Sequence, residues 1–246
     1  MSVPVFHTDP VTLRASDAVV LAGDEGRHAA VVRRIRPGER VDLTDGAGHL
    51  ARCVVVGADR NGLTCDVQDR VDVAEPAPRL VVLQALPKGE RGETAVETMT
   101  EVGVDEIVPW SASRCMVRWK GERGEKALRK WRSTAREAAK QSRRAWFPKV
   151  ADPAATPAAA DRLATATRGL VLHEEAETAL GDVELPAHGE IVMVVGPEGG
   201  VAPEELEAFR AVGAEPVRLG PTVLRTSTAG TVAAGIILSR TARWNP

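Results

Sequence analysis

The chain has 246 residues, of which 43% are hydrophobic and 27% charged, and its formal net charge is −2. This length suits one large domain or two small ones, and the composition is ordinary for a globular protein. The first residues hold no basic segment followed by an apolar one, and no apolar stretch is long enough to span a membrane. We therefore expect a cytoplasmic protein without a signal peptide or a membrane span.

The sequence shows no metal site. Cys53, Cys65 and Cys115 are few and far apart, and no C-x-x-C pair exists. Neither a zinc site nor a disulfide framework is indicated, and we expect reduced thiols that are buried or partly buried.

Charge is unevenly distributed along the chain. Residues 120–149 hold 11 Lys or Arg and 3 Asp or Glu, a local charge of +8, whereas residues 174–215 hold 11 acidic residues and one arginine, a local charge of −10. The basic segment has the density of a phosphate-binding surface, although a solvated helix face is the commoner explanation of such a run.

The first third of the chain is predicted to be rich in β-strands. Short apolar runs and turn residues indicate strands at 3–6, 18–21, 40–45, 50–56 and 63–67, with one helical turn at 26–34. Strands this close together are typical of a small barrel. Residues 72–79 are poor in strand-forming residues and contain two prolines, so we predict a first domain at 1–72 and a second at 73–246.

The second part alternates strands with helices. Strands are predicted at 80–86, 106–109, 169–172, 191–195 and 216–219, and helices at 90–102, 124–144, 203–212 and 227–240. The Ala/Pro/Thr-rich residues 151–167 are interpreted as a loose connector or a poorly packed helix. This alternation predicts a mostly parallel α/β sheet.

Two loops follow predicted strands and can carry chemistry. One is Gly196-Pro197-Glu198-Gly199-Gly200, and the other runs from Leu219 to Gly230 with the bend Gly220-Pro221. Glycines at the carboxyl ends of parallel strands let a ligand approach the backbone closely, although each loop can also be a simple turn into a capped helix. Neither loop is a phosphate loop or a dinucleotide fingerprint, which argues against a nucleotide-binding oxidoreductase.

Read together, the two loops resemble those of the SPOUT-class methyltransferases. The match is closest to the family that methylates N3 of a uridine in 16S ribosomal RNA, and it covers nearly the whole chain. Supporting motifs are found at 86–90, 100–104, 113–114, 141–148 and 172–174, and His28, Arg34 and Pro37-Gly38 resemble its PUA-like barrel. The chain departs from the family at Ser227, Thr222 and Val5, where glutamate, a basic residue and arginine are usual.

The resemblance implies an α/β protein with a small N-terminal PUA-like β-barrel and a C-terminal SPOUT α/β domain that contains a trefoil knot. It also implies a homodimer, S-adenosylmethionine as the cofactor, and 16S ribosomal RNA of the small ribosomal subunit as the partner. The cofactor-binding residues would be Leu172, His173, Gly196, Glu198, Gly200, Leu219, Gly220, Val223 and Leu224. Glu198 can alternatively cap a helix, and His173 can be a core histidine.

Removal of the N3 proton leaves negative charge on the uracil ring, which a cation near the carbonyl oxygens would stabilise. Arg225 and Arg114 are the candidates for this catalytic role, with a structural salt bridge as the alternative, and no general base stands out. RNA contacts are expected from His28, Arg34, Arg114, Gln141, Arg143 and Arg144. Trp131 and Trp146 can stack on bases or lie in the core.

Two further interpretations stay open. The chain can be another SPOUT enzyme that methylates ribose 2′-hydroxyls or transfer RNA, although the simplest of these enzymes lack a PUA-like barrel. It can also be a non-catalytic RNA-binding module, against which the intact glycine loop argues.

Overall fold

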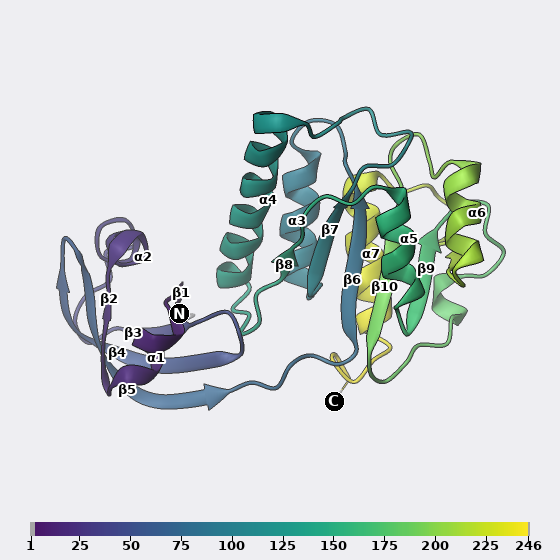
Figure 1. The fold of residues 1–246 in the computed structure, drawn as a ribbon. Coiled ribbons are helices and arrows are strands. Elements are labelled where there is room, and N and C mark those ends of the chain that lie inside the picture. The colour runs from purple at the N-terminus through teal and green to yellow at the C-terminus, as the bar shows by residue number, and fades with distance from the viewer. Residues whose placement is uncertain (1–2, 246) are drawn as a thin grey trace. The chain divides into compact units, whose positions relative to one another are not determined.

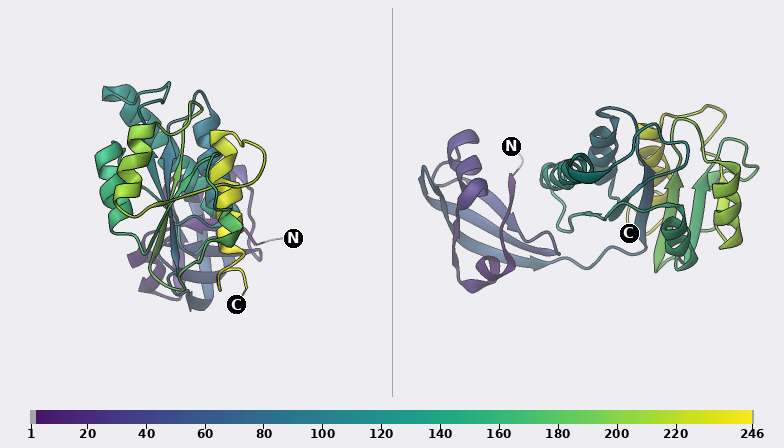
Figure 2. Two further views of the ribbon diagram at one scale, coloured as in Figure 1. Left: turned by 90° about the vertical axis from the view of Figure 1, so that its right-hand side faces the viewer. Right: turned by 45° about the horizontal axis from the view of Figure 1, so that its top comes forward.

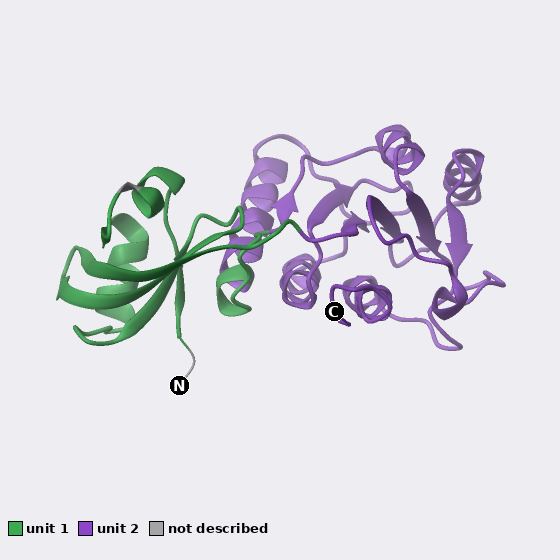
Figure 3. Ribbon diagram, turned by 90° about the horizontal axis from the view of Figure 1, so that it is seen from below, with its two compact units in different colours: residues 1–75, 139–147 green, residues 76–138, 148–246 purple. Residues whose placement is uncertain are grey.

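The computed structural model describes residues 3–245, so Met1, Ser2 and Pro246 lie outside the described part. The chain divides into two compact units, coloured separately in Figure 3. Unit 1 comprises the residues up to Glu75 together with Ala139–Phe147, and unit 2 comprises Pro76–Ala138 and the residues from Pro148 onward.

Unit 1 is built on a five-stranded sheet of order β1-β3-β4-β5-β2. Its strands are β1 (Val5–His7), β2 (Ala18–Leu21), β3 (Arg40–Thr44), β4 (His49–Asp59) and β5 (Gly62–Asp72). β1 runs parallel to β3, and the other neighbours are antiparallel. Alternate side chains such as Val41 and Leu43 point into one apolar core, and the short apolar runs of the sequence marked these strands.

The helical parts of unit 1 differ from the prediction. α1 (Pro10–Ala15) was not predicted, and Asp9 caps it by accepting a hydrogen bond from the Thr12 amide at 2.8 Å. The helical turn predicted at 26–34 begins earlier, as α2 (Gly23–Arg27), and continues as a π-helical turn over His28–Val32.

Residues 139–147 belong to unit 1, although the sequence placed them in the second domain. The Gly48 amide donates to the Ala145 carbonyl at 3.0 Å, and the Phe147 amide donates to the Gly46 carbonyl at 2.8 Å. These bonds attach the segment to the turn between β3 and β4.

Unit 2 contains a six-stranded sheet of order β11-β9-β10-β6-β7-β8 in which all neighbouring strands are parallel. The strands are β6 (Arg79–Ala85), β7 (Glu106–Trp110), β8 (Lys149–Val150), β9 (Arg168–Leu172), β10 (Glu190–Val195) and β11 (Glu215–Val217). The mostly parallel α/β sheet predicted from the sequence is therefore confirmed.

Helices cover both faces of this sheet. They are α3 (Arg91–Val102), α4 (Gly121–Gln141, whose last turn belongs to unit 1), α5 (Thr156–Ala164), α6 (Pro203–Ala211) and α7 (Thr226–Leu238). α7 lies on one face, beside α3, and α5 and α6 lie on the other (Figures 1 and 2). No helix among residues 3–245 is long and apolar enough to cross a membrane.

Residues 151–167 are better ordered than the sequence suggested, because they contain the packed helix α5. Ala159 and Leu163 on this helix are buried in the core of unit 2. A helix was one of the two interpretations of this segment, but its packing was not expected, because alanine contributes little to an amphipathic pattern.

α4 ends at Gln141, three residues before its predicted end at Arg144. Arg143 adopts a left-handed conformation with φ of 56°. The Arg143 amide donates to Lys140 at 3.2 Å and the Arg144 amide to Ala139 at 2.9 Å, which is the Schellman arrangement that usually places glycine at this position.

Candidate active site

A cavity of about 880 Å³ lies at the carboxyl ends of β9, β10 and β11. Three loops line it: the residues after β9 from His173, the glycine loop after β10 (residues 196–201), and the long loop between β11 and α7 (residues 218–225). Carboxyl ends of parallel strands are where open α/β sheets bind ligands, so the topology itself places the cavity.

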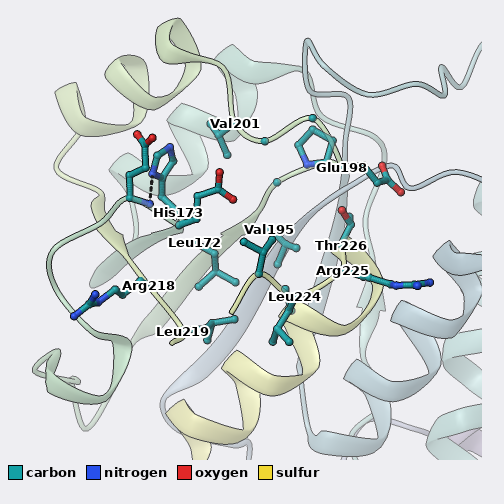
Figure 4. A pocket seen from close by; sticks show the side chains of 18 of the residues that line it. Leu172, His173, Val195, Glu198, Val201, Arg218, Leu219, Leu224, Arg225 and Thr226 are labelled. Carbon is teal, nitrogen blue, oxygen red and sulfur yellow. Dashed lines mark hydrogen bonds between the residues drawn. The ribbon is translucent and has the colours of Figure 1, made fainter. Parts of the chain in front are cut away.

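The cavity has an apolar middle and two polar ends. Leu172, Val195, Leu219 and Leu224 lie in the middle, with His173 toward one end and Arg225 toward the other (Figure 4). Glu174, Glu175 and Arg218 add charge to the lining, and the sequence analysis did not single them out. A flat ring flanked by polar groups fits such a shape.

The structure brings both predicted loops to this one cavity. All nine residues expected to bind a cofactor line it, and so do both candidate catalytic arginines, Arg114 and Arg225. The structure places these residues around one cavity, and the role of each in binding or catalysis is a proposal.

The glycine loop is closed by a hydrogen bond from the Gly200 amide to the Pro197 carbonyl at 2.9 Å. Glu198 is exposed, and its carboxylate accepts a hydrogen bond from the Lys88 amide at 3.4 Å. Glu198 does not cap α6. Glu205 has that role, because its carboxylate accepts the Ala202 amide at 3.2 Å.

The loop after β11 leads into α7 through Arg225. The Arg225 carbonyl accepts the amides of Thr228 and Ala229, both at 2.9 Å. Its guanidinium is exposed and has neither a hydrogen bond nor an ion pair within residues 3–245. The structural salt bridge considered for Arg225 is therefore not formed among the described residues, and the cation is left available at one end of the cavity.

A polar residue that the sequence analysis missed fixes the start of α7. Gln84 is fully buried at the end of β6, and its Nε2 donates to the carbonyls of Thr226 at 3.2 Å and Ala85 at 3.1 Å. Its Oε1 is buried and has no hydrogen-bond partner in the described part of the chain. The signal in the sequence was a single glutamine inside the apolar run 80–86.

Arg114 reaches the glycine loop from the segment after β7. Its Nη1 donates to the Gly199 carbonyl at 3.1 Å, and the side chain is exposed. A Cβ built on Gly199 would lie 3.2 Å from the Cβ of Arg114, so the two loops are in direct contact at this glycine.

His173 lies half-buried in the cavity lining rather than in the core. Its backbone amide donates to Val217 at 2.9 Å, which continues the pairing of β9 with β11. Its Nδ1 accepts the Glu175 amide at 3.3 Å, the contact drawn as a dashed line in Figure 4. The neutral ring therefore carries its proton on Nε2 in this arrangement.

The predicted RNA-binding residues other than Arg114 gather in unit 1. These are His28, Arg34, Gln141, Arg143 and Arg144. Arg34 and Arg143 are both exposed and both left-handed, with φ of 56°. Neither guanidinium has a hydrogen bond or an ion pair among the described residues, whereas the Nε of Arg144 donates to the Trp146 carbonyl at 2.8 Å.

Neither tryptophan of the basic segment is a free stacking platform. Trp131 is 2% exposed and packs edge-on against Trp119 at 4.9 Å between ring centroids. Trp146 is half-buried, and its Nε1 donates to the Val73 carbonyl at 2.9 Å. Within residues 3–245 no group of three or more His, Cys, Asp or Glu side chains could hold a metal ion.

Comparisons with known proteins agree with this geometry. Residues 74–238 match the model of an RNA methyltransferase domain, and residues 21–68 match that of an RNA methyltransferase PUA domain. The chain is 50% identical to the ribosomal RNA small subunit methyltransferase E of Mycobacterium tuberculosis, over 98% of this chain and 93% of that one.

Two solved structures share the whole architecture. One is the ribosomal RNA small subunit methyltransferase E of Neisseria gonorrhoeae bound to S-adenosylmethionine, with 26% identity, a TM-score of 0.84 and coverage of 97% and 98% of the two chains. The other is a Legionella pneumophila methyltransferase with the same bound cofactor, with 25% identity, a TM-score of 0.84 and coverage of 98% and 99%.

Proposed function

Because this chain belongs to the RNA methyltransferase family, and within it to the ribosomal RNA small subunit methyltransferases E, we propose that it methylates N3 of a uridine in 16S ribosomal RNA with S-adenosylmethionine as the methyl donor. The observation that carries the proposal is the 880 Å³ cavity, in which the glycine loop meets the loop before α7 and in which Arg225 has no side-chain partner among residues 3–245.

The cavity fits S-adenosylmethionine in shape and in polarity. Leu172, Leu219 and Leu224 offer apolar contacts for a flat adenine ring. Gly220 lines the same space, and a Cβ built there would meet no atom within 4 Å, so a ligand can reach the backbone at that point. Backbone groups of Gly196 and Gly200 would hold the remaining polar parts of the cofactor.

Methyl transfer needs position and electrostatic stabilisation from the protein, since bound S-adenosylmethionine supplies an already activated methyl group. Arg225 and Arg114 would face the uracil carbonyl oxygens and stabilise the negative charge that develops when the N3 proton leaves. Arg225 suits this role because its guanidinium has no internal partner among residues 3–245. The Arg114 guanidinium makes one hydrogen bond among the described residues, to the Gly199 carbonyl, which leaves its other N–H donors available.

Arg34, Arg143 and Arg144 in unit 1, with His28 and Gln141, would contact the RNA backbone. Phosphate contacts of this kind give salt-sensitive affinity without sequence information. We therefore infer that the substrate is the assembled small subunit, whose shape supplies the discrimination that a few phosphate contacts lack. A ribosomal substrate also implies a cytoplasmic enzyme.

A homodimer is part of the proposal. Val232 in the middle of α7 and Trp244 beyond its end are 44% and 49% exposed, and these apolar side chains are the candidates for the subunit interface. A trefoil knot in the last third of the chain is also proposed. The guanidinium of Arg240 holds the end of α7 within this region, because it donates to the carbonyls of Leu180 and Val183 at 2.9 and 2.6 Å.

The proposal is tested by mass spectrometry of nucleosides from 16S ribosomal RNA of a strain that lacks this protein. We expect one N3-methyluridine to disappear, to return with the wild-type chain, and to stay absent with Arg225→Ala. An unchanged set of methyl marks would contradict the proposed function, and loss of a ribose methyl group instead would assign the chain a different acceptor atom.

A further inference from the structure

A buried carboxylate connects two segments of the cavity lining, the glycine loop and the loop that carries Arg114. Glu205 on the first turn of α6 is 5% exposed. Its Oε1 accepts the Ser113 amide and the Thr156 hydroxyl, both at 2.8 Å, and its Oε2 accepts the Ala202 amide at 3.2 Å. Ala202 directly follows the glycine loop, and Ser113 directly precedes Arg114. One side chain therefore holds the backbone of both loops.

A second side chain, that of Arg118, also binds the peptide groups that precede Arg114. Arg118 donates from Nη1 to the Ala112 carbonyl at 3.0 Å and from Nη2 to the Ser113 carbonyl at 2.9 Å. Ser113 thus has its N–H bound by Glu205 and its C=O bound by Arg118. Arg114, the next residue, then reaches the Gly199 carbonyl across a contact in which a Cβ on Gly199 would stand 3.2 Å from the Arg114 Cβ.

From these contacts we propose that Glu205 is a positioning residue that holds the loop carrying Arg114 against the glycine loop. As a result, a ligand bound by the glycine loop fixes the position of Arg114. This inference rests on the proposed function for the role of Arg114. Glu205 itself is not among the residues that line the cavity.

The chemistry of the three bonds explains why a carboxylate is needed. Two ionised oxygens can accept all three donors at once, whereas an amide has one accepting oxygen and presents its own N–H groups to the others. Glu205→Gln keeps the shape but leaves at least one buried donor without an acceptor. The arrangement that holds Ser113 and Ala202 together is then lost, with little change in packing volume.

Steady-state kinetics on small-subunit particles test the inference through four variants. Glu205→Gln should lower kcat about tenfold, which corresponds to ~1.4 kcal/mol. Glu204→Gln is the matched control, because Glu204 is exposed on the same turn and outside the cavity, and it should leave kcat unchanged. In the Arg114→Ala background, Glu205→Gln should cost no further kcat, because a residue that acts through Arg114 has nothing left to position.

The variant Thr156→Val distinguishes a positioning role of Glu205 from a general contribution of its hydrogen bonds to the stability of the fold. It removes one donor to Glu205 but leaves Ser113 and Ala202 bound, so it should lower the melting temperature while kcat stays within about twofold. The inference would be overturned if Thr156→Val and Glu205→Gln lost the same stability and also the same kcat. It would also be overturned if the kcat losses of Glu205→Gln and Arg114→Ala were fully additive in the double variant. If Glu205→Gln fails to fold, Arg118→Met replaces it as the test, because it removes the other side chain that binds the backbone of Ser113. Arg118→Met must then lower kcat in the wild-type chain but cause no further loss in the Arg114→Ala background.

Hydrogen exchange gives a readout that does not depend on methyl transfer. S-adenosylmethionine should slow exchange in the peptide covering residues 111–118 of the wild-type chain, and this protection should vanish in Glu205→Gln but persist in Glu204→Gln. Binding of the cofactor by calorimetry without any change in that peptide would overturn the inference. A wild-type chain that shows the protection but does not methylate particles would instead contradict the proposed function alone.

Discussion

Arg143 offers a test in which stability and RNA binding change in opposite directions. It occupies the left-handed position after α4 with φ of 56°, where α3 and α6 have Gly103 and Gly213. A non-glycine residue in this conformation costs about 1–2 kcal/mol, and glycine loses about 0.5–1 kcal/mol more conformational entropy on folding. The Arg143→Gly variant should therefore be more stable than wild type by about 0.5–1 kcal/mol.

The matched variant is Arg143→Ala, which removes the same charge but keeps the unfavourable backbone conformation. Thermal unfolding should show a melting temperature that is higher for Arg143→Gly by roughly 1–4 °C, and no such gain for Arg143→Ala. Because the Arg143 guanidinium has no hydrogen bond or ion pair within residues 3–245, its removal breaks no internal bond that would offset this gain.

RNA affinity should fall in both variants. The slope of log affinity against log salt is negative, and each lost phosphate contact makes it shallower by about 0.7 for single-stranded RNA. Filter binding over a salt series would measure this slope. Equal stability of the glycine and alanine variants would refute the backbone argument, and an unchanged salt slope in both would remove Arg143 from the RNA-binding surface.

The remaining predictions concern the cavity, the ion pairs and the dimer. Gly220→Phe should leave the fold intact, because the space around Gly220 is open, but should abolish S-adenosylmethionine binding in calorimetry; undiminished affinity would move the cofactor elsewhere. The hydrogen bond from Arg162 lowers the pKa of Glu190 below its ordinary 4.5, so this pair stabilises the fold above that pH and loses its effect as the pH falls through the lowered value. Glu190→Gln should accordingly unfold more easily than wild type in urea at pH 7, with the difference shrinking in acid; a difference independent of pH would contradict this assignment. Val232→Glu should convert a dimer into a monomer in light scattering at micromolar concentration, and a wild-type monomer would contradict the proposed assembly.

The sequence predicted the elements whose apolar patterns are strong. The runs at 80–86 and 191–195 are nearly continuous because parallel strands are buried on both faces, and they became β6 and β10. Two of the three loops that line the cavity, the glycine loop and the loop before α7, were located because glycine and proline interrupt the pattern directly after such strands. Residues at the ends of parallel strands converge in space, so sequence alone could bring these loops together.

Other features depend on contacts that no local pattern records. The end of α4 was placed too late because arginine, not glycine, adopts the left-handed position at Arg143. Residues 139–147 join unit 1 through backbone hydrogen bonds to Gly46 and Gly48, which are nearly one hundred positions away in the chain. Glu205 looked like an ordinary acid in the first turn of a helix, and only the fold shows that it holds Ser113.

The central claim is that this chain methylates a uracil base at N3 in 16S ribosomal RNA of the small subunit. The most direct measurement is transfer of a labelled methyl group to purified 30S particles and to protein-free 16S RNA at the same salt concentration, followed by mass spectrometry of the nucleosides. We predict N3-methyluridine at one position, formed faster on particles, because the uridine must be unpaired and correctly presented for N3 to be reached. A methyl group on the ribose, or no product on either RNA, would contradict the account.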